Sequence, residues 1–440
     1  MNRVLAVILL CCSAVLVYSA QADVFKDATK GWGRDISSEY FGMTFHGLVP
    51  LPSGKYPTTQ WPQPPINFSS IRLWDTTTRW ADIAPNPGQW DFERLDRFVG
   101  VSAKHGAEVV YVLGSTPRWA SARPDESCPY GLGCSAEPVR MAHWEEYVRR
   151  VAKRYRGRIR AYELWNEPNV VDNFPNRGAM KGYFFTGSVA QLVEMARVAR
   201  KVLDEEDPAA ILTTPAIVNA PIILDQFFAA GGKQYVQAVA YHFYSSSDVN
   251  FVEQIVAIRT IMERHGAGQL PLWNTEAGFP VYPERESLPP GAQRLTRDEA
   301  AARMAQVLIL GAAAGLDRFY YYAWENRLMG LVGFNGEPLS GFDAMQKVQK
   351  WLLGSRMAGC SSLGNKMVRC DGENAGQRFV IAWADTPINK TIPLPPGWRV
   401  ASVEALLGTA LIQTKTDRRG NVTLLIDKAP VRVLLAPVQH

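Results

Sequence analysis

The chain lacks the sequence patterns of several common enzyme classes. Its six histidines form no H-x-H or H-E-x-x-H pair, so we expect no catalytic metal. No G-x-S-x-G elbow occurs, which argues against a serine hydrolase. The net charge of +5 is small and is scattered over 440 residues, so it gives no reason to expect a nucleic-acid partner. Any catalytic chemistry therefore has to come from other side chains.

Residues 1–22 have the pattern of a cleaved signal peptide. Arg3 precedes an apolar run from Val4 to Val17, and Ala20-Gln21-Ala22 matches the small-residue pattern of a cleavage site. The run is shorter than the roughly 20 residues of a membrane-spanning helix, which argues against the alternative of a retained anchor. We expect a mature chain that begins at Asp23, is periplasmic or secreted, and has no stable membrane insertion.

Cysteine is scarce, because two of the six cysteines fall within the leader and four remain. These four form two local pairs, and in an exported protein such pairs predict the disulfides Cys128–Cys134 and Cys360–Cys370. A zinc site is the competing interpretation. It is disfavoured because neither pair has C-x-x-C spacing or a nearby histidine cluster.

Apolar runs typical of buried strands alternate with stretches of helical spacing over residues 23–353. Two of the helices begin with capping-box patterns, Ser188 to Gln191 and Thr296 to Glu299. Hydrophobic residues make up 47% of the chain, which is enough for a large core. We therefore predict an α/β fold, a (β/α)8 TIM barrel. Its eight expected strands are Tyr40–His46, Ser70–Trp74, Glu108–Leu113, Ile159–Trp165, Ala210–Thr214, Val236–Tyr244, Leu270–Glu276 and Arg318–Trp324.

The pattern changes from about Gly354 onward. Short β-type runs follow one another, separated by glycine, asparagine and proline. This pattern predicts a small antiparallel β-sandwich over residues 354–440, packed on the barrel.

Two of the expected barrel strands end in a glutamate. The apolar run before Asn166 and Glu167 is stopped by Pro168, which cannot donate a ladder hydrogen bond. A second apolar run ends at Glu276 and is broken by Gly278. In a parallel barrel the carboxyl ends of the strands form the rim where substrates bind. The sequence therefore predicts two carboxylates at that rim, on the fourth and seventh strands.

Paired carboxylates at a barrel rim are the groups that glycoside hydrolysis needs. One protonates the leaving oxygen, and the other acts as a nucleophile or activates water. We expect an ionised Glu276 to raise the pKa of Glu167 and so keep it protonated. With these features the sequence resembles the retaining glycoside hydrolases of clan A, and most of all family 39, which includes β-xylosidases and bacterial exopolysaccharide hydrolases.

The resemblance implies a role for each matching residue. Glu167 corresponds to the general acid/base and Glu276 to the nucleophile. The other matching positions are expected to bind substrate or to orient these two groups, and they are Arg72, Asn166, His242, Tyr244 and Trp324. Arg72 and Tyr244 are expected to donate hydrogen bonds to Glu276, and Trp324 to offer a flat apolar face to a sugar ring.

Several points stay open at this level. His46 and Trp119 fall at strand ends and are either substrate contacts or rim packing. Arg72 has the alternative of a purely structural ion pair with a buried acid. Strict alternation along a strand would point Asn166 and Glu167 in opposite directions, so we expect a twist or bulge there.

The sequence as a whole predicts an exported retaining O-glycosidase that acts on a β-linked oligo- or polysaccharide without a cofactor. A catalytically silent carbohydrate-binding barrel and a transglycosylase are the alternatives. The sugar, the linkage, endo or exo action and the oligomeric state are not decided by the sequence.

Overall fold

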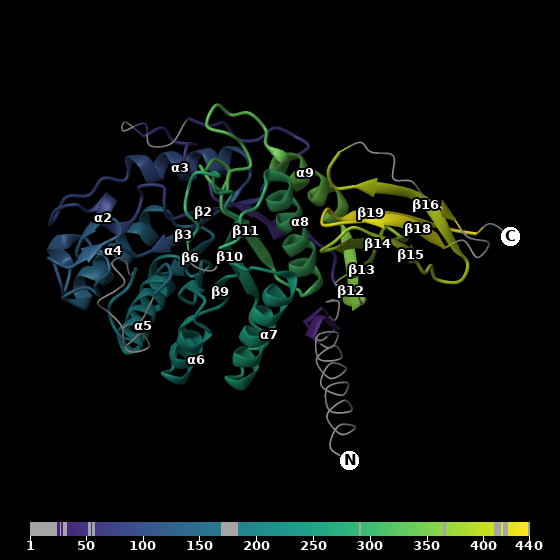
Figure 1. Cartoon of the computed structure of the whole chain (residues 1–440). Coiled ribbons are helices and arrows are strands. Elements are labelled where there is room, and N and C mark those ends of the chain that lie inside the picture. Colours follow the sequence, from purple (N-terminus) through teal and green to yellow (C-terminus); the bar gives the residue numbers. More distant parts are fainter. Residues whose placement is uncertain are drawn as a thin grey trace, which may run out of the picture.

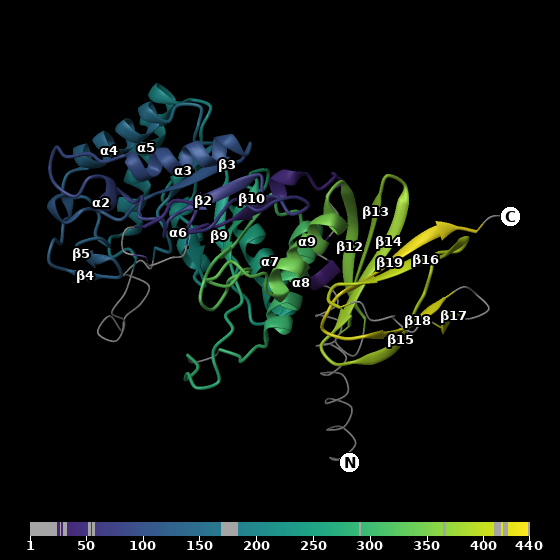
Figure 2. The same cartoon turned by 90° about the horizontal axis from the view of Figure 1, so that it is seen from above.

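The computed structural model describes residues 24–26, 28–29, 33–51, 54, 58–168, 184–289, 292–363, 367–408, 415–416 and 421–438. The chain forms a ring of strands surrounded by helices, and a β-rich part lies beside it (Figure 1 and Figure 2). Among the described helices, none is both long and apolar enough to cross a membrane. The predicted signal peptide at residues 1–22 lies outside the described residues.

The strands of the first part form one parallel sheet that closes into a barrel. The hydrogen-bonded order is β7-β6-β3-β2-β1-β11-β10-β9-β8, and a parallel bridge between Thr213 and Ala238 joins β7 to the strand entering β9. β7 and β8 are two pieces of one interrupted strand, so the described sheet has eight positions around the ring. The predicted (β/α)8 barrel is confirmed. Its strands are β1 (Phe41–Met43), β2 (Ser70–Leu73), β3 (Glu108–Leu113), β6 (Ala161–Leu164), β7 (Ile211–Thr213), β8 (Ile217–Val218), β9 (Val239–His242), β10 (Leu272–Ala277) and β11 (Arg318–Tyr321).

Helices connect the strands and cover the outside of the barrel (Figure 1). The two capping boxes of the sequence start helices as expected, because the Ser188 and Thr296 hydroxyls each accept a hydrogen bond from the backbone three residues later. The helices are α2 (Trp80–Ile83), α3 (Glu93–Lys104), α4 (Met141–Arg154), α5 (Val189–Glu206), α6 (Pro221–Ala229), α7 (Asp248–Arg264), α8 (Arg297–Ala313) and α9 (Ser340–Leu352).

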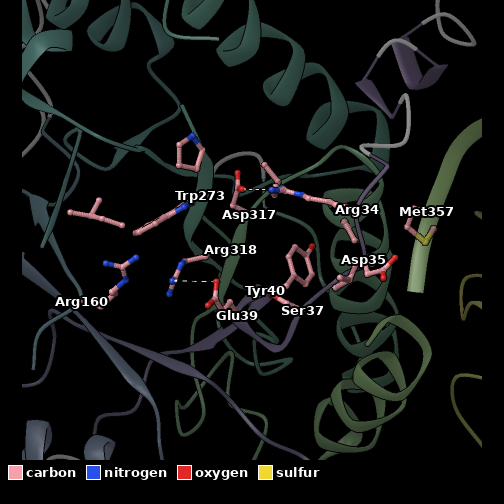
Figure 3. A pocket seen from close by; sticks show the side chains of 15 residues that line it. Arg34, Asp35, Ser37, Glu39, Tyr40, Arg160, Trp273, Asp317, Arg318 and Met357 are labelled. Carbon is pink, nitrogen blue, oxygen red and sulfur yellow. Dashed lines mark hydrogen bonds and ion pairs between the residues drawn. The ribbon is translucent and has the colours of Figure 1, made fainter. Parts of the chain in front are cut away.

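The inside of the barrel is packed rather than open. Gly42 on β1 is required for this packing, because a Cβ atom there would lie 2.4 Å from the ring of Tyr320. At the amino ends of the strands, a cavity of about 240 Å³ contains charged side chains (Figure 3). Arg34 pairs with Asp317 at 2.6 Å, and Arg318 pairs with Glu108 at 2.6 Å. These charges neutralise each other, as expected for the barrel end that serves stability.

The C-terminal part forms two antiparallel sheets, ordered β12-β13-β14-β19-β16 and β15-β18-β17, as the predicted sandwich requires. Val380 and Leu424 belong to the buried cluster between them. The other face of the larger sheet packs on the barrel helices, and the Trp383 indole donates to Asp248 of α7 at 2.6 Å. The strands are β12 (Ser355–Leu363), β13 (Met367–Asn374), β14 (Gln377–Ala384), β15 (Ile388–Ile392), β16 (Trp398–Ala405), β17 (Lys415–Thr416), β18 (Val422–Ile426) and β19 (Val431–Pro437).

Both predicted disulfides are present in the described residues. Cys128–Cys134 closes a hairpin of β4 (Ser127–Cys128) and β5 (Gly131–Leu132), with Cα atoms 5.8 Å apart. Cys360–Cys370 links the adjacent strands β12 and β13 across directly opposed residues. The first hairpin lies in the loop after β3, on the rim that carries the two glutamates.

Candidate active site

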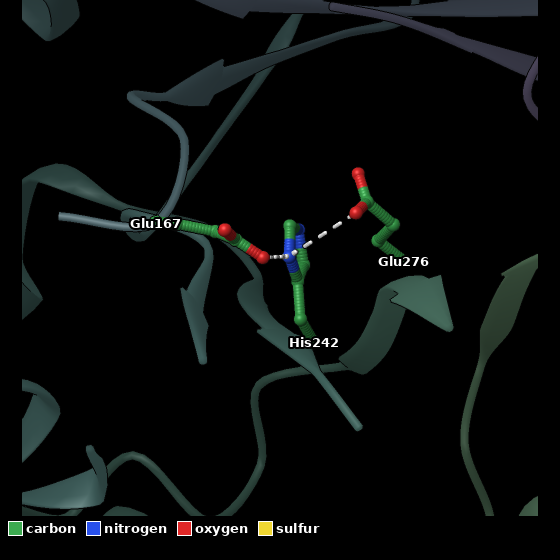
Figure 4. Close-up of side chains that lie close together, drawn as sticks. All are labelled: Glu167, His242 and Glu276. Carbon is green, nitrogen blue, oxygen red and sulfur yellow. Dashed lines mark hydrogen bonds and ion pairs between the residues drawn. The ribbon is translucent and has the colours of Figure 1, made fainter. Parts of the chain in front are cut away.

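The carboxyl ends of β6 and β10 bring Glu167 and Glu276 together. Glu276 lies within β10, and Glu167 follows the end of β6 by three residues. His242, at the end of β9, lies between them (Figure 4). One carboxylate oxygen of each glutamate and a ring nitrogen of His242 all lie within 4.8 Å of one another. The fourth and seventh positions of the barrel therefore supply the pair, as the sequence predicts.

The backbone after β6 explains how neighbouring residues reach the same site. Trp165 and Glu167 have φ angles of 62° and 44°, in the left-handed region that residues other than glycine rarely adopt. Asn166 between them forms a parallel bridge with Ala216. The strand therefore bends at its end, as expected, and the usual alternation of side chains is interrupted. Strained backbone of this kind is common at functional sites.

Arg72 connects the acidic groups of the site and is fully buried. Its Nη1 donates to Glu276 at 2.7 Å, and its Nη2 donates to Asn166 Oδ1 at 2.6 Å. The same Nη2 donates to Glu163 at 2.6 Å, and Glu163 is also fully buried. Arg72 therefore forms the ion pair with a buried acid and also the expected hydrogen bond to Glu276, and its role in the site stays a prediction.

Two more side chains hold the carboxylates. The Tyr244 hydroxyl donates to Glu276 Oε1 at 2.8 Å, as expected. His242 Nδ1 lies 2.8 Å from Glu167 Oε1 and 4.0 Å from Glu276 Oε1. Gly278 allows the chain after β10 to approach the end of β11, because a Cβ atom there would lie 2.3 Å from the carbonyl oxygen of Tyr322.

Burial raises the pKa values of both carboxyls and lowers that of the histidine between them. Burial raises the pKa of Glu167 to about 7, so this carboxyl is largely protonated in mildly acidic solution. Burial also raises the pKa of Glu276, but the Arg72 guanidinium opposes that shift and favours its ionised form. Burial lowers the pKa of His242 to about 4, so its imidazole is neutral near pH 7. The expected direction for Glu167 is correct, but its leading cause is burial, and the neighbouring charge that adds to it is Asp75.

Glu167, His242 and Glu276 lie close enough together to hold a metal ion. Two oxygens and an imidazole nitrogen are suitable ligands for a divalent ion such as zinc. Arg72 already provides a cation 2.7 Å from Glu276, and a metal ion beside it would be repelled. The absence of a catalytic metal stays a prediction.

Trp324 is packed among other aromatic side chains. Trp324 is only 4% exposed, it is surrounded by Phe45, Phe68 and Phe342, and its indole donates to Thr59 at 3.1 Å. This packing disagrees with the expected open face for a sugar ring, because aromatic neighbours cover the indole.

His46 and Trp119 both have packing contacts at the rim, and a contact of either with substrate stays a prediction. His46 is fully buried, and its Nδ1 lies 3.0 Å from the Glu325 carbonyl oxygen. Trp119 is half-buried, donates to the Ala84 carbonyl at 2.8 Å and packs edge-on against His143. Glu325 was not expected from the sequence. It is fully buried and accepts backbone hydrogen bonds from His46 and Gly47, which joins the end of β11 to the end of β1.

Asp75 is a further acidic residue at the site that sequence reasoning missed. It follows β2 and is half-buried, and its negative charge raises the pKa values of both Glu167 and Glu276. The Tyr130 hydroxyl donates to Asp75 Oδ1 at 2.7 Å, and the Tyr322 hydroxyl donates to Oδ2 at 2.9 Å. Its place three residues after Arg72, at a strand end, is the signal that could have identified it.

Comparisons with known proteins place this fold among glycoside hydrolase structures. A family 39 glycoside hydrolase from Bacteroides cellulosilyticus WH2 superposes with a TM-score of 0.65 and 18% identity, over 91% of this chain and 82% of that one. A monomeric beta-xylosidase from Caulobacter crescentus CB15 gives 0.61 and 16% identity, over 93% and 98%. A family 30 subfamily 8 xylanase from Clostridium acetobutylicum gives 0.57 and 15% identity, over 84% and 89%. The predicted resemblance is confirmed in the fold.

Sequence comparison covers less of the chain. Beta-galactosidase BgaB from Geobacillus sp. (strain Y412MC61) is 27% identical, over 26% of this chain. The chain covers 20% of the length of that curated relative. No protein-family model matches the chain.

Proposed function

We propose that the chain is an exported retaining glycoside hydrolase that cleaves O-glycosidic bonds of a β-linked oligo- or polysaccharide. The proposal rests chiefly on the Glu167 and Glu276 carboxylates. One oxygen of each lies within 4.8 Å of an oxygen of the other. Retaining glycosidases have their two carboxyl groups roughly 5 Å apart, whereas inverting enzymes separate them by roughly 6.5–9.5 Å to admit water. The spacing therefore favours a covalent, double-displacement mechanism.

In the first step, Glu276 attacks the anomeric carbon while Glu167 gives its proton to the leaving glycosidic oxygen. The hydrogen bonds from Arg72 and Tyr244 orient the attacking carboxylate and favour its ionised form. The C–O bond to the leaving group breaks as the ester bond to Glu276 forms. Asn166, held through its Oδ1 by Arg72, can donate from Nδ2 to the 2-hydroxyl of the reacting sugar.

In the second step, the ionised Glu167 takes a proton from water, and the water oxygen attacks the anomeric carbon. The ester bond to Glu276 breaks, the sugar leaves with its original configuration, and Glu167 regains its proton. A pKa of about 7 suits a group that must act first as an acid and then as a base. A sugar hydroxyl in place of the water would give transglycosylation. The lengths of the products measure the ratio of transglycosylation to hydrolysis.

The names of similar proteins and the cysteine pairs support the wider proposal. The similar structures include a beta-xylosidase and a xylanase, and the curated relative is a beta-galactosidase, so we infer a saccharide substrate with β linkages. Disulfides persist mainly in oxidising compartments, and the pairs Cys128–Cys134 and Cys360–Cys370 favour export.

Hydrolysis of a panel of aryl β-glycosides and polysaccharides tests the proposal. We expect release by the wild type and by Glu373→Gln, an exposed control on β13, but not by Glu276→Ala. Glu167→Ala should keep activity toward aryl glycosides whose leaving groups need no proton, and it should lose activity toward polysaccharides. Binding of saccharides without release from any substrate would instead favour a catalytically silent binding barrel.

A further inference from the structure

Asp75 is held on both sides in a fixed position at the rim of the site. Tyr130 and Tyr322 each donate a hydroxyl hydrogen bond to one of its oxygens, at 2.7 and 2.9 Å. A carboxylate has about four lone-pair sites, so each oxygen keeps room for a further donor. The side chain is half-buried, so part of it stays accessible. The result is a pre-oriented acceptor that a sugar hydroxyl can reach.

The two tyrosines come from distant parts of the chain, and each is fixed by its own surroundings. Tyr130 lies in the hairpin closed by Cys128–Cys134, and its hydroxyl accepts a hydrogen bond from the Trp74 indole at 2.8 Å. The Arg79 guanidinium lies 3.7 Å from the centre of its ring. Tyr322 follows β11 directly, at the point where Gly278 packs against it. The wall beside Asp75 is therefore aromatic, hydroxyl-bearing and rigid.

The arginines Arg72 and Arg79 at this side of the site are each paired with other carboxylates, so neither is reserved for an acidic substrate. Arg72 is paired with Glu163 and Glu276, and Arg79 binds Asp82 through two nitrogens, at 2.8 and 3.1 Å. These two guanidinium groups are thus already bound to carboxylates, whereas the Arg94 guanidinium donates to the backbone carbonyls of Thr76, Pro50 and His46. Asp75 adds a negative charge that also acts on both candidate catalytic glutamates.

We propose that Asp75 is a substrate-binding and specificity residue, which accepts a hydroxyl of a neutral sugar and repels sugars that carry a carboxylate. A neutral sugar supplies hydroxyl donors to the two oxygens, whereas a uronic acid places a like charge against them. This inference rests on the proposed glycosidase function, and it narrows the substrate at the reacting position to neutral sugars.

Matched pairs of aryl β-glycosides test the inference, because a glucoside and a glucuronide, or a galactoside and a galacturonide, differ only at the terminal carbon. We expect wild-type kcat/KM to favour the neutral member. Asp75→Asn keeps the shape and an acceptor for one of the two tyrosine hydroxyls, and it removes the charge. It should reduce the neutral-to-acidic ratio about tenfold, which corresponds to about 1.4 kcal/mol.

Two controls separate charge from packing. Tyr130→Phe removes one hydrogen bond and keeps the charge, so it should raise KM while leaving the neutral-to-acidic ratio unchanged. Asp35→Asn removes a charge at the opposite end of the barrel, where Asp35 pairs with Arg356, and should change neither quantity. An unchanged ratio in Asp75→Asn, or an equal loss of ratio in Tyr130→Phe, would overturn the specificity role.

Binding to neutral and uronate oligosaccharides by the Glu276→Ala variant gives a readout that needs no turnover. We expect Glu276→Ala to bind only neutral oligosaccharides. The double variant with Asp75→Asn should bind uronate oligosaccharides as well. Preference for uronates would overturn the inference, while Glu276-dependent release of an acidic sugar would leave the glycosidase function standing. No release and no binding of any saccharide would refute the proposed function and the inference together.

Discussion

Burying Glu167 should cost the protein stability, and this cost can be measured as a function of pH. The pKa of Glu167 is raised by burial from its ordinary value of 4.5 to about 7. A carboxyl that binds its proton more tightly when folded stabilises the fold fully below the unfolded pKa. That contribution is lost as the pH rises from about 4.5 through about 7. Between these pH values the loss amounts to about 3 kcal/mol, because each tenfold change in proton affinity corresponds to 1.36 kcal/mol.

Glu167→Gln replaces the carboxyl with a neutral group of the same shape, so the pH-dependent cost should disappear. At pH 8 the variant should be more stable than the wild type by up to about 3 kcal/mol, and at pH 4 the difference should be small. Denaturant unfolding of both proteins at the two pH values measures the effect, and Glu373→Gln on the exposed surface serves as the control. An equal difference at pH 4 and pH 8 would refute the argument that burial causes the shift.

Three further predictions follow from the same contacts. The kcat/KM of the wild type should fall on the basic side near pH 7, because deprotonation of Glu167 removes the acid. If Glu167→Ala showed the same basic limb with aryl substrates, this assignment would be wrong. Tyr244→Phe removes a donor to the charged form of Glu276, so the acidic limb should move to higher pH with the basic limb unchanged. Trp324→Ala should lower the free energy of unfolding by about 3–5 kcal/mol with little change in KM, because Trp324 is buried. A large rise in KM with no loss of stability would instead support a role in stacking on a sugar ring.

The sequence predicts the barrel and the meeting of Glu167 and Glu276 at its rim, because both depend on local patterns. Strand ends can be located from apolar runs and from their stops at Pro168 and Gly278, and in a barrel all such ends face one rim. Arg72, Tyr244 and Glu276 are each placed by their own strands, so their contacts follow once the strand order is known. The fifth strand is split into β7 and β8, a detail of the backbone that the apolar pattern does not contain.

Features that depend on distant packing could not be predicted in the same way. Tyr130 reaches Asp75 from a disulfide-closed hairpin 55 residues away in the sequence, and no local pattern indicates that meeting. The turn at Asn166 uses positive φ values at Trp165 and Glu167 without a glycine to signal them. Trp324 stands at the expected strand end, but its packing by three phenylalanines is a tertiary property. The pKa of Glu167 likewise depends on burial, which only the folded chain defines.

In the proposed mechanism, Glu167 and Glu276 act together in a double displacement with retention of configuration. Proton NMR of the first sugar released from a β-glycoside, recorded before mutarotation, tests it most directly. We expect the β anomer to appear first and Glu276→Ala to abolish its release. Initial appearance of the α anomer, or release that persists without the Glu276 carboxylate, would contradict it.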